Sequence, residues 1–309
     1  MKDKKIVFMG TPDFAVNILE GLIDNGYNVV LVVSQPDKMV GRKRELRNTP
    51  VKECALKNGI EVYQPINIKN EYDKIVEVNP DIIITCAYGQ IIPKVLIDLP
   101  ELGCVNVHAS LLPKYRGGAP IHKVIMNGES KTGVTIMYMD VTMDTGDIIS
   151  CSEVDILDSD NVGTLHDKLA LCGSNLLLET LPSILDKSNG RVKQDHDNAS
   201  YGYNVSRDEE RIDFSKSSRE VFNHIRGLNP WPMAYCLVNG EEFKVLDSKM
   251  VVDNSRVMTG HILNSSKKEL IVKTSDGAIS LLVIKPFGKK IMNVSDYLNG
   301  VNKEDLVIE

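Results

Sequence analysis

Short runs rich in valine and isoleucine recur through the first 140 residues, and the first three are each followed by a segment with helical character. Strands that alternate with helices are typical of a parallel sheet whose connections cross over through the helices. This alternation predicts an α/β fold built on a Rossmann-like, mostly parallel sheet. The runs are KKIVFMG (4–10), NVVLVVS (28–34), PDIIITCA (80–87), GCVNVHA (103–109) and TGVTIMYMD (132–140).

The turn after the first run predicts a helix start. Thr11 offers a capping hydroxyl, and Pro12 suits the first helical position. Asn25 and Gly26 are expected to end this helix. The turn reads GTPDFA and lacks the G-x-G-x-x-G spacing, so no dinucleotide cofactor is predicted. The apolar residues at helical spacing are Phe14, Ile18 and Leu22.

The second half of the chain predicts a change of architecture. A long helix is expected over 164–188, broken or capped near Pro182, before a polar stretch with Gly, Asn and Asp. Beyond it, a short helical segment precedes strand-like pieces with turns at close intervals, a pattern typical of a small antiparallel β-barrel, OB-like, or a sandwich. We therefore predict a catalytic domain over 1–188, a linker over 189–205 and a C-terminal β-barrel domain over 206–309.

Charge is unevenly distributed. The net charge is −6, yet residues 37–52 carry six basic side chains against two acidic ones, and residues 256–290 carry seven against two. Either cluster by itself is typical of solvated surface. Two such clusters, one in each half of the chain, favour a polyanionic partner that spans both.

Cysteine spacing and hydropathy argue against a secreted protein and against a membrane-spanning one. The six cysteines lie at least 18 residues apart, with no C-x-x-C and no secreted disulfide framework. They are interpreted as reduced thiols, mostly in the core, of a cytoplasmic protein. The first ten residues do not form a secretory signal, and no apolar run approaches the roughly 18 residues of a membrane span.

An amide and an imidazole lie two positions apart at the end of the fourth run. Side chains alternate along a strand, so Asn106 and His108 share one face and converge at the strand's exit. In open α/β sheets, ligands bind beyond the carboxyl ends of the strands. The turn MDVTMDTGD, which leaves the next strand, carries Asp140, Asp144 and Asp147, and a neighbouring strand could place one of these carboxylates against the imidazole. In the alternative interpretation, Asn106 caps a turn, His108 is a satisfied core histidine and Asp144 is a turn residue.

Other chemistries lack their signatures. The six histidines show no H-x₃-H spacing and no paired cysteine, so no metal site is predicted. A serine nucleophile would need a G-x-S-x-G elbow, and Ser110 lies in a different context. An amide, an imidazole and a carboxylate without a protein nucleophile suit acyl-type transfer in which the substrate supplies the nucleophile.

The central motifs resemble those of the formyltransferases that use 10-formyltetrahydrofolate. NVHASLLPKYRGGAPI followed by GVTIMYMDVTMDTGDII is similar to the core signature of this family, with Gly118 where alanine is commoner. The resemblance to the tRNA-acting branch covers essentially the whole chain. It includes VFMGTPDFAV, QPDKMVGRKRELRNTPVK, AYGQIIP, RIDF, GLNPWPMAY and PFGKK, while ASYGYNVSRDEERIDF varies the usual linker-end pattern.

This resemblance implies a function and a division of labour among residues. The expected reaction moves the formyl group of 10-formyltetrahydrofolate to the α-amino group of methionyl initiator tRNA, for translation initiation, with no metal, no membrane and no obligate protein partner. The family's catalytic residues fall on Asn106, His108 and Asp144. The folate segment falls on Ser110, Leu111, Leu112 and Pro113, and the tRNA contacts are expected at Arg42, Lys43, Arg44, Lys289 and Lys290.

Three rival functions stay open on the sequence. A sugar-nucleotide N-formyltransferase would share the catalytic residues and the folate donor, but the two basic clusters count against it. Hydrolysis of formyltetrahydrofolate is possible because water can replace the amine. A nucleic-acid-binding module with a degenerate enzyme fold is disfavoured because all three candidate catalytic residues are present.

Overall fold

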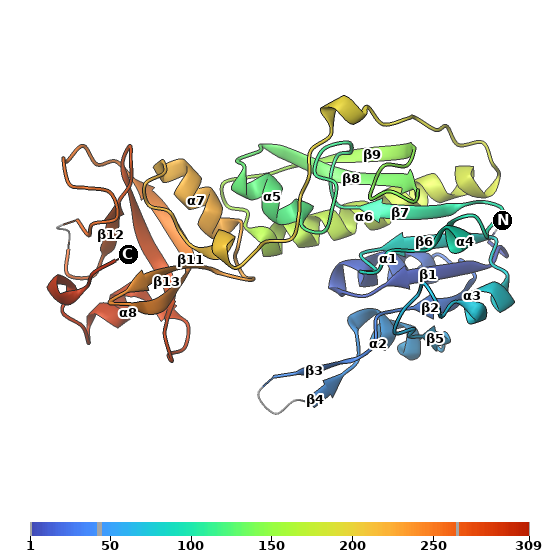
Figure 1. Cartoon of the computed structure of the whole chain (residues 1–309), viewed down its shortest axis with the longest axis horizontal. Helices are drawn as coiled ribbons and strands as arrows, with labels where there is room; N and C mark the ends of the chain where they lie inside the picture. Colours follow the sequence, from blue (N-terminus) through green and yellow to red (C-terminus); the bar gives the residue numbers. More distant parts are fainter. Residues whose placement is uncertain (1, 42–44, 264–265, 309) are drawn as a thin grey trace. The chain divides into compact units, whose positions relative to one another are not determined.

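The computed structural model describes residues 2–41, 45–263 and 266–308. A seven-stranded sheet runs in the order β5-β2-β1-β6-β7-β8-β9 (Figure 1). The first five strands in this order pair in parallel, whereas β7–β8 and β8–β9 are antiparallel. This confirms the predicted α/β class. The strands are β1 (Ile6–Gly10), β2 (Val29–Val33), β5 (Val62–Tyr63), β6 (Ile82–Cys86), β7 (Cys104–His108), β8 (Lys131–Tyr138) and β9 (Ile148–Asp155).

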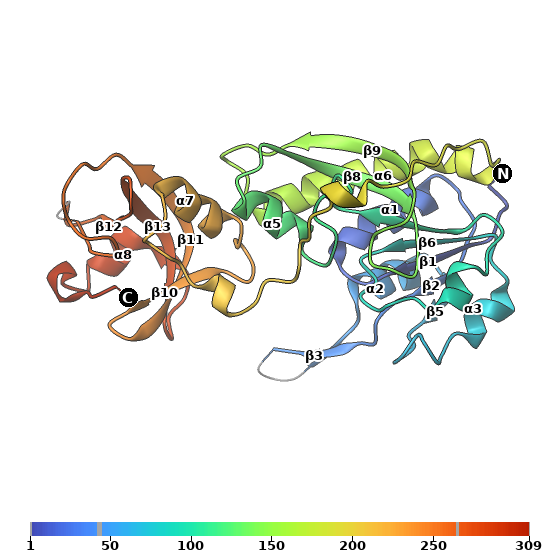
Figure 2. The same ribbon diagram turned by 45° about the horizontal axis from the view of Figure 1, so that its top comes forward.

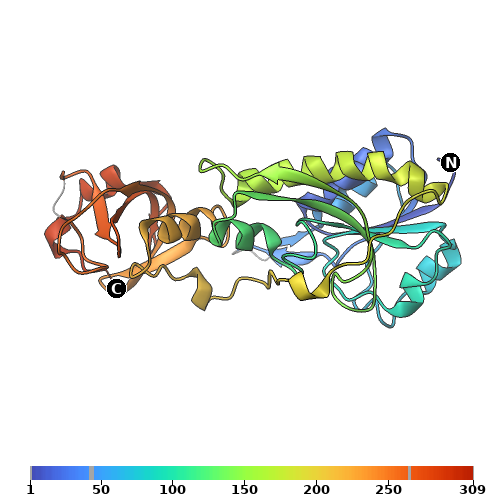
Figure 3. The ribbon, with the colours of Figure 1, turned by 90° about the horizontal axis from the view of Figure 1, so that it is seen from above.

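Helices cover both faces of this sheet. On one face, α1 (Asp13–Asp24) packs with α6 (Val162–Leu185) through Gly21 against Ser174, and Gly173 of α6 lies against Val107 of β7. On the other face, α3 (Asp73–Val78) and α4 (Lys94–Ile97) contribute to a core that includes Cys104. Figure 3 shows α6 and α3 on opposite sides of the strands. The apolar runs are buried on both sides, as parallel strands require.

Two local predictions about helices are wrong. Thr11 does not cap α1, because its hydroxyl donates to the carbonyl of Tyr88 at 2.8 Å and accepts from the N–H of Gln35. The helix begins at Asp13, with Pro12 at the N-cap position. Pro182 does not break α6, which continues to Leu185. Asn25 does end α1 as predicted.

A hairpin leaves the body of the sheet between β2 and β5. It consists of β3 (Lys38–Val40) and β4 (Glu45–Arg47), and Figures 1 and 2 show it extending away from the strands. The helix α2 (Pro50–Lys57) follows, capped by the Thr49 hydroxyl, which accepts from the N–H of Lys52. Two described basic residues, Lys38 and Arg47, lie opposite each other on the two strands of this hairpin.

A second sheet is antiparallel and runs β10-β11-β13-β12, with β14 paired to β13 (Figure 2). Its strands are β10 (Ala234–Val238), β11 (Glu241–Val251), β12 (Leu270–Lys273), β13 (Ala278–Pro286) and β14 (Met292–Asn293). The helix α7 (Ser218–Arg226) packs against β11 and β13, and α8 (Val294–Leu298) lies beside β13. This confirms the predicted antiparallel C-terminal domain.

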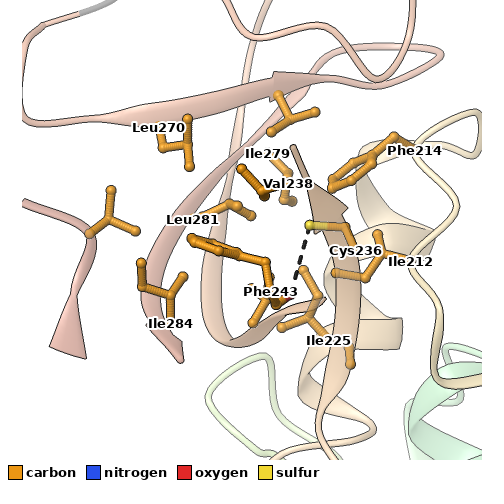
Figure 4. Packing of buried hydrophobic residues seen from close by; sticks show 14 of the residues in the cluster. Ile212, Phe214, Ile225, Cys236, Val238, Phe243, Leu270, Ile279, Leu281 and Ile284 are labelled. Carbon is orange, nitrogen blue, oxygen red and sulfur yellow. Dashed lines mark hydrogen bonds between the residues drawn. The ribbon is translucent and has the colours of Figure 1, made fainter. Parts of the chain in front are cut away.

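The second core is closed by α7. A capping box between Ser217 and Glu220 begins this helix, and the Asp276 carboxylate accepts from the N–H of Ser218. Figure 4 shows the apolar side chains around Cys236, whose thiol donates to the carbonyl of Phe243 at 3.8 Å. Burial raises the pKa of Cys236 to about 12, so this thiol is a packing group.

The chain packs as two compact units. The first consists of Met1–Pro120, Lys131–Asp155 and His166–Tyr203, and the second of Ile121–Ser130, Ile156–Leu165 and Asn204–Glu309. The helix α5 (Pro120–Met126) therefore contributes almost all of its length to the second unit. Residues 189–203, within the stretch expected as a linker, run along the first unit, where Val192 bridges to Ile148 and Tyr201 to Arg116. No helix within the described ranges is long and apolar enough to cross a membrane.

Candidate active site

Asn106 lies in the middle of β7 with its side-chain amide held in one orientation. The Thr85 hydroxyl, on the neighbouring strand β6, donates to Asn106 Oδ1 at 2.9 Å. Parallel pairing places these two residues opposite each other. Because the amide oxygen accepts from Thr85, the Nδ2 group is the part of Asn106 that can donate to a ligand. The sequence analysis did not select Thr85, although a hydroxyl within the apolar run PDIIITCA was a signal for it.

His108 lies at the end of β7, buried between two acceptors. Its Nε2 lies 3.1 Å from the carbonyl oxygen of Tyr115. A carbonyl can only accept, so Nε2 carries a hydrogen and donates it. Its Nδ1 lies 3.7 Å from Asp144 Oδ2, and both side chains are largely buried, at 7% and 14% exposed. Nδ1 is therefore the ring nitrogen that can exchange a proton beside a carboxylate.

Asp144 lies in the loop between β8 and β9 and adopts an uncommon backbone conformation. Its φ is +53°, in the left-handed region that aspartate tolerates better than most residues. The N–H of Gly117 donates to Asp144 Oδ2 at 2.8 Å, the same oxygen that faces His108. Two residues later, a Cβ at Gly146 would lie 1.9 Å from the carbonyl oxygen of Tyr138, so only glycine fits there.

The structure brings the three candidate catalytic residues together. Asn106 and His108 occupy alternate positions on one strand, as predicted, and Asp144 supplies the expected carboxylate. The same acid-rich turn contributes no other carboxylate to the imidazole. Asp140 accepts from the N–H of Val141 beside it and is exposed.

The candidate folate segment, Ser110–Pro113, forms the turn that follows β7. Ser110 is fully buried, and its hydroxyl donates to the carbonyl of Lys114 at 2.7 Å. The Thr135 hydroxyl of β8 donates to the carbonyl of Ser110 and accepts from the N–H of Leu112. The segment is thereby fixed to the sheet next to His108, and Leu111 and Pro113 are its partly exposed side chains.

The basic residues selected from the sequence have different surroundings. Arg42, Lys43 and Arg44 lie outside the described residues, between β3 and β4 in the sequence. Lys289 and Lys290 are exposed in the turn after β13, and the Lys289 ammonium lies 5.3 Å from the centre of the Tyr297 ring.

Asp37, just before β3, forms an ion pair with Lys52 of α2. Burial opposes the charge on Asp37, but hydrogen bonds from Gln64 and Lys52 outweigh it and lower the pKa of this carboxyl.

Two cysteines on the strands that carry Thr85 and Asn106 do not contribute a reactive thiolate to the site. Cys104 begins the strand that carries Asn106 and His108, and burial raises the pKa of its thiol well above the usual range. Burial raises the pKa of the Cys86 thiol, at the end of β6, in the same way. Within the described ranges there is no group of three or more His, Cys, Asp or Glu side chains that could hold a metal ion.

The buried amide Gln194 completes this site and was missed by the sequence analysis. Its Nε2 donates to the carbonyl oxygens of Asp144 and Gly146, at 2.9 and 2.8 Å. Its Oε1 accepts from the guanidinium of Arg116, which is 2% exposed. The polar sequence around Gln194 carried no signal for burial, because the contacts are made to residues about 50 and 80 positions away.

Comparison with known proteins identifies the family. The formyl transferase family model matches residues 4–181, and the model of the formyl transferase C-terminal domain matches residues 204–302. A methionyl-tRNA formyltransferase of Bacillus subtilis is 48% identical over 303 residues, covering 97% of this chain and 96% of the relative. One of Staphylococcus epidermidis is 49% identical and covers 98% of both chains. The chain belongs to the methionyl-tRNA formyltransferase family.

Solved structures support the fold of this methionyl-tRNA formyltransferase family member. An N-formyltransferase from Helicobacter canadensis, in complex with folinic acid and dTDP-3-aminofucose, aligns with a TM-score of 0.69 at 22% identity and covers 92% of this chain and all of its own. A sugar 3N-formyl transferase aligns with a TM-score of 0.67 at 23% identity, covering 93% and 99%. At these identities the likeness establishes the shared fold, so the sugar-acting enzymes are distant structural neighbours.

Proposed function

We propose that this protein transfers the formyl group of 10-formyltetrahydrofolate to the α-amino group of methionyl initiator tRNA. Full-length relatives at 48 to 50% identity are methionyl-tRNA formyltransferases, which supports the reaction and the tRNA substrate. The single observation that carries the chemistry is the convergence of Asn106, His108 and Asp144 at the end of β7.

The reaction needs charge stabilisation and a proton relay. The amine nitrogen attacks the formyl carbon, and the carbonyl oxygen takes the electron pair. The bond from carbon to the folate nitrogen then breaks, and a proton passes from the attacking nitrogen to the leaving one. A free α-amino group titrates near 7.7 to 8. Esterification lowers this value, so much of the amine is neutral at pH 7 and its deprotonation is a small part of the problem.

Asn106 is the proposed oxyanion donor. Its Nδ2 is directed by the bond between Thr85 and Oδ1, so the donor is oriented before substrate binds. A donor fixed in advance stabilises the tetrahedral intermediate without reorganisation, and loss of one such donor typically costs about 10² to 10³ in rate.

His108 is the proposed carrier of the proton. Its Nε2 is occupied by the carbonyl of Tyr115, which leaves Nδ1 to accept the proton from the amine and return it to the leaving nitrogen. Asp144 lies beside Nδ1 and is proposed to orient the ring while this proton is in transit.

The remaining sites are proposed from the family resemblance, with position and charge in support. We propose that Ser110–Pro113 lines the folate through its backbone and the side chains of Leu111 and Pro113. Arg42, Lys43 and Arg44 are proposed to contact the acceptor end of tRNA, and Lys289 and Lys290 its phosphates. On this proposal, residues 1–188 catalyse, 206–309 bind tRNA, and the enzyme acts in the cytoplasm without a metal.

Turnover of 10-formyltetrahydrofolate with and without acceptor tests the function. We expect release of tetrahydrofolate to depend on methionyl initiator tRNA and to match formylmethionyl-tRNA formation one for one. Equal release without tRNA would indicate hydrolysis. Release supported by an amino-sugar nucleotide, with none supported by tRNA, would favour the sugar-acting alternative and overturn the proposal.

A further inference from the structure

The Asp144 loop is held by one buried side chain from a distant part of the chain. Gln194 is 6% exposed and lies in the stretch between α6 and the second unit. Both hydrogens of its amide are used on that loop, one on the carbonyl of Asp144 at 2.9 Å and one on that of Gly146 at 2.8 Å. A single amide group therefore joins two peptide units of the loop, the one between Asp144 and Thr145 and the one between Gly146 and Asp147.

Arg116 fixes the orientation of this amide. Its Nε and one terminal nitrogen donate to Gln194 Oε1, at 3.1 and 2.7 Å. A guanidinium only donates, so Gln194 must direct its oxygen to Arg116 and its nitrogen to the loop. The same terminal nitrogen of Arg116 lies 3.1 Å from Nδ1 of His196, which extends the network along the same segment.

The backbone beside Arg116 holds the other side of Asp144. The N–H of Gly117 donates to Asp144 Oδ2, the oxygen nearest His108. Arg116 in turn exchanges backbone hydrogen bonds with Ser200 and Gly202, which continue the segment that carries Gln194. Gly117 thus binds the carboxylate of Asp144, and Gln194 binds its main chain. Both partners belong to one hydrogen-bond network.

The backbone of Asp144 needs such support. A non-glycine residue in the left-handed region persists when surrounding contacts determine its conformation. The carboxylate must also stay beside Nδ1 of His108, since a misplacement of about 1 Å in a catalytic group can cost about 10²-fold in rate. The bonds from Gln194 meet both requirements, because they fix the carbonyl group of Asp144 itself and that of Gly146 two residues later.

We propose that Gln194 is a positioning residue for formyl transfer, acting through Asp144, with Arg116 orienting its amide. The inference rests on the proposed role of Asp144 in proton transfer. It assigns a function to residues 189–203, a segment whose sequence is typical of a polar connection. Because Gln194 touches neither the imidazole nor the proposed donor Asn106 in these contacts, its effect must pass through the loop.

Gln194→Glu separates the two halves of the network. Glutamate keeps an oxygen for Arg116 and loses the two hydrogens that bind the loop. We expect the single-turnover rate of formyl transfer to fall by about 10- to 100-fold, with the KM values for folate and tRNA within about 2-fold of the native enzyme. Thr180→Val is the matched control, because it removes a buried hydroxyl bonded to Ser150 in the same unit, and its rate should stay native.

A double-mutant cycle with Asp144→Asn distinguishes positioning from a general structural effect. If Gln194 acts through Asp144, adding Gln194→Glu to Asp144→Asn lowers the rate by less than about 2-fold further. Multiplication of the two losses would overturn the inference while leaving the role of Asp144 intact. A native rate in Asp144→Asn alone would instead defeat the proposed proton path, and the inference with it.

Stability measurements complete the test. Thermal unfolding of each variant reports whether the first unit is folded at the assay temperature. If Gln194→Glu does not fold, Gln194→Met replaces it in the same cycle, since it has similar length, no charge and no hydrogen to donate. A native rate in either folded variant overturns the inference.

Discussion

Acidification should destabilise the second unit through one partly buried histidine. His224 lies on α7, and its pKa is lowered to about 4 by burial first and then by the charge of Lys216. A hydrogen bond with the Glu209 backbone and the carboxylates of Asp213 and Glu209 act in the opposite direction and do not cancel the shift. Nε2 of His224 is buried with no hydrogen-bond partner among the described residues.

His224 also lines a mixed-charge cavity of about 610 Å³ on the second unit. The charged side chains around this cavity are Lys123, Asp208, Glu209, Arg211, Asp213, Lys216 and Glu220.

The size of the effect follows from proton linkage. An unfolded histidine titrates near 6.5, so the unfolded chain binds a proton below this pH while the folded chain does so only near pH 4. The stabilising contribution is thus fully present above pH 6.5 and is lost as the pH falls from 6.5 toward 4. At pH 5, proton binding to this histidine raises the unfolding equilibrium constant by about 30-fold relative to neutral pH. This corresponds to a loss of about 2 kcal/mol in the free energy of unfolding.

Urea unfolding at about pH 7.5 and pH 5.0 measures this loss. Trp231 is the only tryptophan of the chain and lies in the second unit, so its fluorescence reports on that unit. His224→Phe should be less sensitive to acid than the native protein by about 2 kcal/mol. The hydrogen bond that phenylalanine loses costs the same at both pH values and cancels in the comparison. Equal acid sensitivity in the two proteins would refute the reasoning.

Four further outcomes are expected. Gly146→Ala should lower the transfer rate by about 10-fold or more, because its Cβ would lie 1.9 Å from the Tyr138 carbonyl oxygen and displace the loop; a native rate would contradict this. Arg42→Ala should weaken engagement of methionyl-tRNA and leave folate affinity unchanged; a folate defect alone would reverse the assignment. Replacing Lys289 and Lys290 together should reduce the slope of log affinity against log salt by about 0.7 to 0.9 per lost phosphate contact. An unchanged slope would show that both lysines are solvated surface residues that make no phosphate contact. Turnover should survive EDTA, and inactivation that zinc reverses would contradict a metal-free site.

The fold was predictable where local pattern and tertiary packing agree. The five apolar runs became β1, β2, β6, β7 and β8 because a sheet covered by helices on both faces needs such sequences, in its parallel strands and in the antiparallel strand β8 alike. Thr11 failed as a cap since its hydroxyl binds Tyr88 and Gln35, on loops that follow β6 and β2, and no local pattern encodes those contacts.

Pro182 illustrates the same limit within a helix. Proline removes one backbone hydrogen bond, which favours a break when a helix is judged by itself. In the structure, buried leucines and an isoleucine flank Pro182 on the inner face of α6 and hold the helix on the sheet. Tertiary burial therefore outweighs the local preference. The flanking residues are Leu177, Leu181, Ile184 and Leu185.

The candidate catalytic residues could be predicted from the sequence, whereas the residues that orient them could not. Asn106 and His108 share a strand, so alternation alone placed them together, whereas the adjacent strand offered three aspartates and the family resemblance selected Asp144. Thr85 carried a weak signal as a hydroxyl in an apolar run. Gln194 is joined to the Asp144 loop by a pairing that spans about 50 residues, and its sequence context is typical of a solvated loop.

Single-turnover formylation by His108→Ala and Asn106→Ala tests the central claim most directly. With saturating 10-formyltetrahydrofolate and methionyl initiator tRNA, the rate should fall by about 10² to 10⁴ in His108→Ala, from lost proton transfer. It should fall by about 10² to 10³ in Asn106→Ala, from a lost oxyanion donor. Thermal unfolding of both variants should stay near that of the native enzyme. A near-native rate in either folded variant would contradict the assignment of formyl transfer to these residues.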